Sequence, residues 1–178
     1  MTAQAGDELT KLITTLVRDI PDYPQRGVVF KDITPLLADG QAFSAVVDAL
    51  AGLYGPVDKV AGIEARGFIL AAPVACCLRA GFVPVRKQGK LPAETLAESY
   101  QLEYGTATVE VHVDAFQPGD RVLIVDDVLA TGGTAAASVS LVRRSGAEVV
   151  AVSVLLELGF LGGRARLPDV EVRSLLAV

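Results

Sequence analysis

Several features that mark specialised classes of protein are scarce in this 178-residue sequence. Its two cysteines, Cys76 and Cys77, are adjacent, which suits neither a structural disulfide nor metal-ligand spacing. We therefore expect buried thiols and a reducing, cytoplasmic setting. The most apolar run, residues 67–78, is shorter than the ~20 residues that a membrane-spanning helix needs. The N-terminus lacks the basic region and apolar core of a secretion signal, and no internal repeat is evident.

Positive charge is also in short supply. There are 16 Lys and Arg residues against 21 Asp and Glu, which gives a formal net charge of −5 and a pI near 4.9. Because such a field repels nucleic acids and anionic membranes, we expect neither as a partner, and any phosphate recognition must be local. The single histidine, His112, lies in the alternating segment 106–116, where we expect a solvent-facing strand position rather than a catalytic imidazole.

The apolar pattern predicts an α/β fold with a central, mainly parallel sheet flanked by helices. Buried strands are expected at 59–63, 82–86, 120–127 and 147–158, and helices at 1–16, 40–53, 67–80 and 134–145. Residues 87–117 differ, because a polar, glycine-punctuated stretch precedes alternation typical of an antiparallel strand. The length suits a single domain, 1–178, with an N-terminal helix and hood at about 1–37 and a mobile lid excursion at about 87–105.

The stretch "IVDDVLATGGTAAAS", residues 124–138, carries the strongest functional signal. Ligands of open α/β sheets bind beyond the carboxyl ends of the strands, where Asp126 and Asp127 are expected. The following residues form a glycine-rich turn into a helix, whose backbone N–H groups and threonine hydroxyls can bind a phosphate. Paired carboxylates beside that phosphate are placed to accept hydrogen bonds from sugar hydroxyls. The predicted ligand is a sugar phosphate, held by Asp126, Asp127, Ala130, Thr131, Gly132, Gly133 and Thr134.

The same stretch, two acids followed by "LATGGT", resembles the phosphoribosyl-diphosphate signature of the type I phosphoribosyltransferases. Four further stretches, "PDYPQRGVVFKDITPLL", "GIEARGF", "RKQGKLP" and "YQLEYG", resemble the adenine-using branch of that family, in the right order along nearly the whole chain. The resemblance implies the type I fold with a small hood and an antiparallel lid. It also implies transfer of phosphoribosyl from phosphoribosyl diphosphate to adenine, giving AMP and diphosphate, in purine salvage by a magnesium-dependent homodimer.

The resemblance also implies roles for particular residues. Val28, Val29 and Phe30 would bind adenine together with Arg66, although ordinary core packing would produce the same apolar pattern at 28–30. A strained peptide bond is implied near Glu64. No protein ligand for magnesium is expected, since substrate diphosphate and ribose hydroxyls would hold the ion. The diphosphate-binding residues would be Glu64, Ala65, Arg66, Arg86, Lys87 and Lys90, of which the last three could equally form a solvated basic edge.

The lid would supply the catalytic group. Transferases for 6-oxopurines typically have an aspartate where this chain has Ala130, so an acid/base role moves to Glu103, flanked by the lid residues Tyr100 and Tyr104. A solvated loop acid is the alternative for Glu103. Two other functions stay open: a type I transferase for hypoxanthine, guanine, xanthine or orotate, and a non-catalytic regulator that senses phosphoribosyl diphosphate. The regulator would be expected to carry a nucleic-acid-binding domain or basic face.

Overall fold

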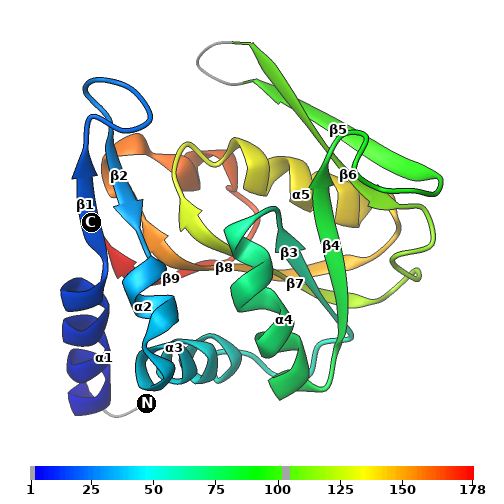
Figure 1. Cartoon of the computed structure of the whole chain (residues 1–178). Helices are drawn as coiled ribbons and strands as arrows, with labels where there is room; N and C mark the ends of the chain where they lie inside the picture. Colours follow the sequence, from blue (N-terminus) through cyan, green and yellow to red (C-terminus); the bar gives the residue numbers. More distant parts are fainter. Residues whose placement is uncertain (1–2, 102–104) are drawn as a thin grey trace. The chain divides into compact units, whose positions relative to one another are not determined.

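The computed structural model describes residues 3–101 and 105–178 (Figure 1). The chain divides into two compact units, Met1–Ala49 and Leu50–Val178. No helix in the described ranges is long and apolar enough to cross a membrane. The single-domain organisation stays a prediction.

The first unit combines helices with a two-stranded sheet. Helix α1 (Ala3–Leu16) precedes strand β1 (Arg18–Pro21), which pairs antiparallel with β2 (Val29–Asp32). The short helix α2 (Thr34–Ala38) follows, and α3 (Gly40–Ala51) continues to just past the end of this unit. The helix predicted at 1–16 is confirmed over the described residues from Ala3, and the helix predicted at 40–53 is confirmed but ends at Ala51.

The second unit is built on a seven-stranded sheet in the order β5-β6-β4-β3-β7-β8-β9. The pairs β4–β3, β3–β7, β7–β8 and β8–β9 are parallel, whereas β6 pairs antiparallel with both β4 and β5. This confirms the mainly parallel sheet with an antiparallel excursion. The strands span β3 (Lys59–Ile63), β4 (Gly81–Lys87), β5 (Thr95–Gln101), β6 (Thr106–His112), β7 (Arg121–Leu129), β8 (Glu148–Glu157) and β9 (Val172–Ala177).

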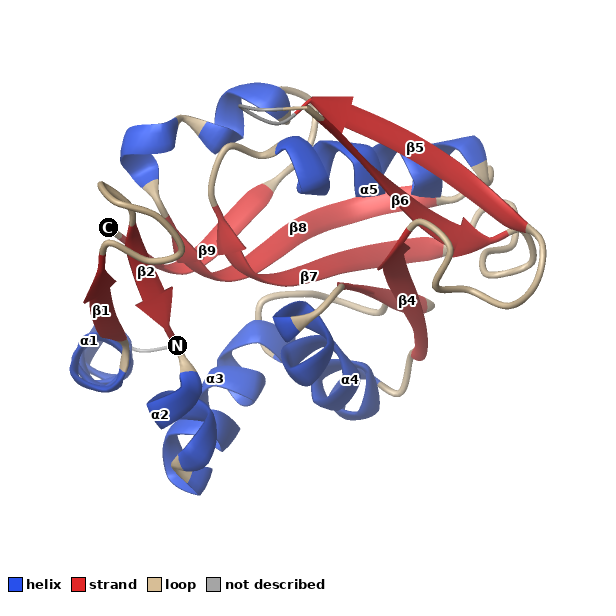
Figure 2. Ribbon diagram, turned by 45° about the horizontal axis from the view of Figure 1, so that its top comes forward, coloured by secondary structure: helices blue, strands red, loops and turns tan. Residues whose placement is uncertain are grey.

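Helices α4 (Arg66–Leu78) and α5 (Gly133–Arg144) cover opposite faces of this sheet (Figure 2). Strands β7 and β8 are apolar at nearly every position because both of their faces are covered. Between β8 and β9 the chain forms two short 3₁₀ helices, η1 (Gly159–Leu161) and η2 (Gly163–Arg166). The core therefore consists mainly of Val, Ile, Leu and Ala side chains from the sheet and α5.

Four sequence-based expectations need correction. Strand β7 does not end at the acids but continues to Leu129, since β8 still pairs with it there. Helix α4 ends before Arg79, which adopts a left-handed φ of 55°, so Gly81 already belongs to β4. Cys76 and Cys77 are exposed, because the buried residues of α4, 67, 70, 71, 74 and 75, share one face of the helix and the two cysteines lie off that face. His112 is half-buried, not solvent-facing, because β5 pairs alongside it.

Candidate active site

The two adjacent aspartates lie near the carboxyl end of β7. Asp126 Oδ1 accepts the Asp127 backbone N–H at 2.8 Å, and Asp127 Oδ2 lies 2.5 Å from Arg66 Nη2. Removal of water by the surrounding atoms, followed by the charge of Asp127, raises the pKa of Asp126 well above its usual value. One carboxylate is thus balanced by a guanidinium and the other is shifted towards its neutral form. The pair can bind sugar hydroxyls without presenting two full negative charges to an anionic substrate.

Residues 130–134, here called the phosphate loop, connect β7 to α5. Gly132 has a φ of +79°, a left-handed conformation that glycine adopts without steric cost, and α5 begins at the next residue. The first backbone N–H groups of α5 have no acceptor within the helix. They border a small hollow of about 70 Å³ that Thr131 and Thr134 also line. This loop has the donors, the helix polarity and the backbone access that an anion requires.

A second backbone turn lies between β3 and α4. The Glu64–Ala65 peptide bond is cis, at the place where the family resemblance implies an unusual peptide. Glu64 Oε2 accepts the Lys87 backbone N–H at 3.0 Å and Arg86 Nε at 3.3 Å, and Arg86 Nη1 donates to the Lys90 carbonyl oxygen at 3.0 Å. The Glu64 carboxylate therefore holds the end of β4, and with it the predicted basic cluster, against this turn.

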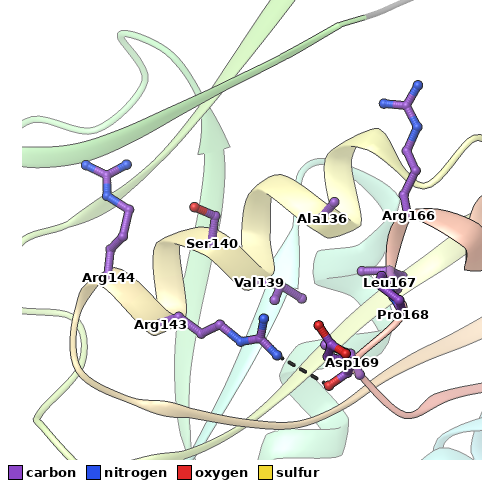
Figure 3. Close-up of a pocket in the computed structure, with 10 residues that line it drawn as sticks. Ala136, Val139, Ser140, Arg143, Arg144, Arg166, Leu167, Pro168 and Asp169 are labelled. Carbon is purple, nitrogen blue, oxygen red and sulfur yellow. Dashed lines mark hydrogen bonds between the residues drawn. The ribbon is translucent and has the colours of Figure 1, made fainter.

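One cavity of about 390 Å³ brings these parts together. A second cavity, of about 270 Å³, lies between α5 and residues 166–170 (Figure 3). It is lined by Arg143, Arg144 and Arg166, and Arg143 Nη2 donates to the Asp169 carbonyl oxygen at 3.3 Å. The larger cavity is the candidate active site, because it joins the paired carboxylates to a phosphate loop and a basic edge. Its lining residues are Ile63, Glu64, Ala65, Arg66, Lys87, Tyr100, Val109, Asp126, Asp127 and Thr134.

The predicted lid reaches this cavity through Tyr100 of β5. Thr134 Oγ1 donates a hydrogen bond of 2.8 Å to Tyr100 Oη, and the Tyr100 ring lies against Gly133. The lid is thus attached to the start of α5 through a residue of the phosphate loop. The proposed catalytic Glu103 and the lid residue Tyr104 lie outside the described residues.

The residues predicted to bind adenine belong to the first unit. Val29 begins β2 and is 50% exposed, whereas Val28 and Phe30 are half-buried. The Phe30 ring meets the Tyr23 ring edge-on, with 5.2 Å between centroids. Ordinary core packing, the alternative explanation for these side chains, does not describe them, since none is fully buried. Their role in binding adenine stays a prediction.

Some features of the site were absent from the sequence-based interpretation. The Arg66–Asp127 ion pair and the Tyr100–Thr134 hydrogen bond each join residues far apart in the chain. Gly163, in the sequence "FLGGRARLP", lies directly against the phosphate loop. The consecutive glycines at 162 and 163 were the available signal, since Gly-Gly marks a turn, but the pattern does not say which segment the turn contacts.

The phosphoribosyl transferase domain model matches residues 34–174, which include strands β3 to β8 and the first residues of β9. The chain therefore belongs to the phosphoribosyltransferase family. Its mainly parallel sheet, acidic pair and phosphate loop agree with that class.

Within this family it belongs to the adenine phosphoribosyltransferases. It is 68% identical over 173 residues to adenine phosphoribosyltransferase of Thermobifida fusca, covering 96% of this chain and 98% of that one. The crystal structure of adenine phosphoribosyltransferase from Thermoanaerobacter pseudethanolicus matches with a TM-score of 0.93 at 50% identity, covering 95% of this chain and 99% of that one. The Saccharomyces cerevisiae enzyme, solved with an imino-altritol bisphosphate and adenine, matches with a TM-score of 0.90 at 35% identity, covering 98% and 100%.

Proposed function

We propose that this protein transfers the 5-phosphoribosyl group of phosphoribosyl diphosphate to adenine, giving AMP and diphosphate in purine salvage. The observation that carries this function is the cavity lined together by Asp126 and Asp127, Thr134 of the phosphate loop and the Glu64–Arg66 turn. A phosphoribosyl diphosphate has matching groups, namely a 5′-phosphate, ribose hydroxyls and a diphosphate. The high identity to adenine phosphoribosyltransferases supports adenine as the acceptor.

Transfer breaks the bond between the ribose anomeric carbon and a diphosphate oxygen, and the electron pair leaves with diphosphate. The lone pair of adenine N9 forms the new bond to that carbon, and the proton that the base carries on N7 passes to Glu103. The phosphate loop holds the 5′-phosphate, and Asp126 and Asp127 accept the ribose hydroxyls. Backbone groups of the Glu64–Arg66 turn, with Arg86, Lys87 and Lys90, stabilise the charge that develops on diphosphate. These assignments rest on the chemistry of each group and on the family resemblance.

The base and the lid complete the proposed site. Val28, Val29 and Phe30 contact adenine together with Arg66, and Glu103 acts as acid/base at the purine N7. Closure of the lid, with Tyr100 and Tyr104, excludes water from the electron-poor sugar that forms during transfer. We further propose that the enzyme is a cytoplasmic homodimer that works without nucleic acid or membrane.

Magnesium is proposed as the cofactor. Asp127 is paired with Arg66, and the pKa of Asp126 is raised, so neither carboxylate is well suited to bind Mg²⁺ directly. The two residues therefore fit an ion that is held by the substrate. Mg²⁺ retains waters and commonly bridges one or two carboxylates and substrate phosphates. When bound, it would neutralise charge on the departing diphosphate. Asp126 and Asp127 would orient the ribose hydroxyls beside the ion.

The test is incubation of the purified protein with phosphoribosyl diphosphate, magnesium and each of adenine, hypoxanthine, guanine, xanthine and orotate. We expect AMP from adenine, no comparable product from the other bases, and loss of AMP formation when EDTA replaces magnesium. Product from another base in preference to adenine would instead identify a transferase for that base. Binding of phosphoribosyl diphosphate with no product from any base would identify a regulator.

A further inference from the structure

The phosphate loop packs against residues 162–163 with backbone against backbone. A Cβ atom added to Gly163 would run into the Ala130 carbonyl oxygen, and one added to Gly132 would run into the Gly163 carbonyl oxygen. The Leu158 N–H also donates to the Leu129 carbonyl oxygen at 2.9 Å, immediately before the loop. The shape of the phosphate loop therefore depends on where the segment between β8 and β9 places Gly163.

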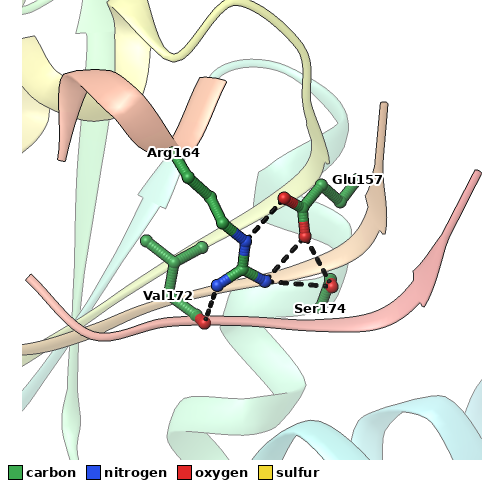
Figure 4. A network of polar contacts seen from close by, with 4 residues as sticks. All are labelled: Glu157, Arg164, Val172 and Ser174. Carbon is green, nitrogen blue, oxygen red and sulfur yellow. Dashed lines mark hydrogen bonds and ion pairs between the residues drawn. The ribbon is translucent and has the colours of Figure 1, made fainter. Parts of the chain in front are cut away.

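Arg164 fixes that segment to both flanking strands (Figure 4). Its Nε and Nη2 donate to Glu157 Oε1 and Oε2 at 2.6 and 2.7 Å, and its Nη1 donates to the Val172 carbonyl oxygen at 2.7 Å. Ser174 Oγ donates to Glu157 Oε2 at 2.9 Å. The Arg164 hydrogen bonds hold the pKa of Glu157 below its usual value, so this carboxyl group is ionised at neutral pH.

We infer that Arg164, held by Glu157 and Ser174, is a positioning residue for the phosphate loop. Arg164 directly follows Gly163, so the bidentate contact to the last residue of β8 sets where the Gly163 backbone lies. The loop donors then face the 5′-phosphate without adjustment on binding. This role rests on the proposed function, in which residues 130–134 hold that phosphate.

A positioning role makes a selective prediction. Loosening the 162–164 segment should weaken ligands that carry a 5′-phosphate and leave ligands without one unchanged. AMP and adenosine differ only in that phosphate, so the ratio of their dissociation constants isolates the phosphate loop. A purely structural role would lower thermal stability and change both affinities together.

The experiment measures AMP, adenosine and ribose 5-phosphate binding by calorimetry for the wild type and Glu157→Gln, which keeps the side-chain shape but removes the charge. We expect AMP and ribose 5-phosphate to bind about tenfold more weakly or worse, and adenosine to bind as before, since the loss of one hydrogen bond to a charged group costs about tenfold in affinity. Arg164→Lys, which keeps the charge but not the planar fork, should move the ratio in the same direction. This second variant serves if Glu157→Gln does not fold.

The matched control is Glu171→Gln, which breaks the exposed pair with Arg173 just before β9 and should leave the ratio unchanged. An unchanged ratio in folded Arg164→Lys would overturn the inference, even if the variant melts at a lower temperature. Failure of the proposed function would look different. The wild type would then form no AMP from adenine, while the variants would still lose affinity for ribose 5-phosphate.

Discussion

The carboxyl group of Asp126 is unfavourable for folding when it is charged, and it is proposed to bind the ribose hydroxyls. It lies at the wall of the cavity beside a second carboxylate, and the surrounding protein disfavours its charged form. Folding does not require two carboxylates to be buried side by side, and such like-charged pairs are common in functional sites. Arg66 pairs directly with Asp127, and its charge offsets only a small part of the rise in the pKa of Asp126.

The raised pKa of Asp126 predicts a pH dependence of stability. The native state keeps a proton on this group at pH values where the unfolded state, with the usual pKa of 3.8, has lost it. Its contribution to the free energy of unfolding is therefore full below the usual pKa and is lost as pH rises through the higher native pKa.

We expect Asp126→Asn to remove this loss, because asparagine mimics the neutral carboxyl group and its Oδ1 can still accept the Asp127 N–H. Urea unfolding of both proteins between about pH 4 and pH 8 gives the difference curve, in which the variant should gain on the wild type as pH rises. A flat difference curve would show that the native and unfolded pKa values are equal.

Glu103 carries the proposed acid/base step. Glu103→Gln keeps the size and one acceptor but cannot exchange a proton, so we expect AMP formation to slow by ~10²- to 10⁴-fold with little change in phosphoribosyl diphosphate affinity. Single-turnover AMP formation at saturating substrates is the measurement, because slow product release would hide a chemical defect. A wild-type single-turnover rate would identify Glu103 as a solvated loop acid.

At the scale of elements, the antiparallel pair β5–β6 and helix α5 are joined at two places. Tyr100 accepts a hydrogen bond from Thr134 at the start of the helix. At its other end, Arg144 Nη1 donates to the Ala97 carbonyl oxygen and to Glu98 Oε2, both at 2.7 Å. The strand that carries the lid is thus attached along the helix that begins at the phosphate loop.

The Tyr100 contact competes with the proposed phosphate for the Thr134 hydroxyl. We expect Tyr100→Phe to bind AMP up to about fivefold more tightly, since one net hydrogen bond of about 1 kcal/mol no longer has to be exchanged. Calorimetric titration with AMP measures this. Ser99→Ala is the control, because it removes a 2.8 Å hydrogen bond to Thr108 in the same strand pair but does not touch Thr134. Weaker AMP binding by Tyr100→Phe would mean that the Tyr100 hydroxyl contacts the ligand.

At the scale of the whole molecule, an acidic protein handles an anionic substrate through local arrangement. The net charge of −5 gives no long-range attraction for diphosphate. The second unit instead collects Arg66, Lys87 and the helix N-terminus of α5 around one cavity. Glu64 and Asp127 are occupied by hydrogen bonds or ion pairs within the same unit, which reduces their repulsion of an incoming anion.

Much of the fold and of the candidate site was determined by the sequence alone. The apolar runs at 59–63 and 147–158 predicted β3 and β8, because hydrophobic periodicity reflects the local chain and its burial. Residues 124–138 identified the acids and the phosphate loop, since those chemical groups are consecutive in the chain. The strands β1, β2 and β9 were not predicted, because they are short and contain no fully buried residue.

Only the tertiary structure decided which distant residues meet. The strand order β3-β7-β8-β9 and the return of β5 to α5 create three such contacts. They are Arg66 with Asp127, Tyr100 with Thr134, and Gly163 with Gly132. Arg164 reaches Glu157 and Ser174 because β8 and β9 are parallel neighbours and η2 lies between them in the chain. Local sequence sets which groups a segment carries, but packing sets their partners. The chemical groups of the candidate site were therefore readable from the sequence, whereas the contacts that hold its parts in place were not.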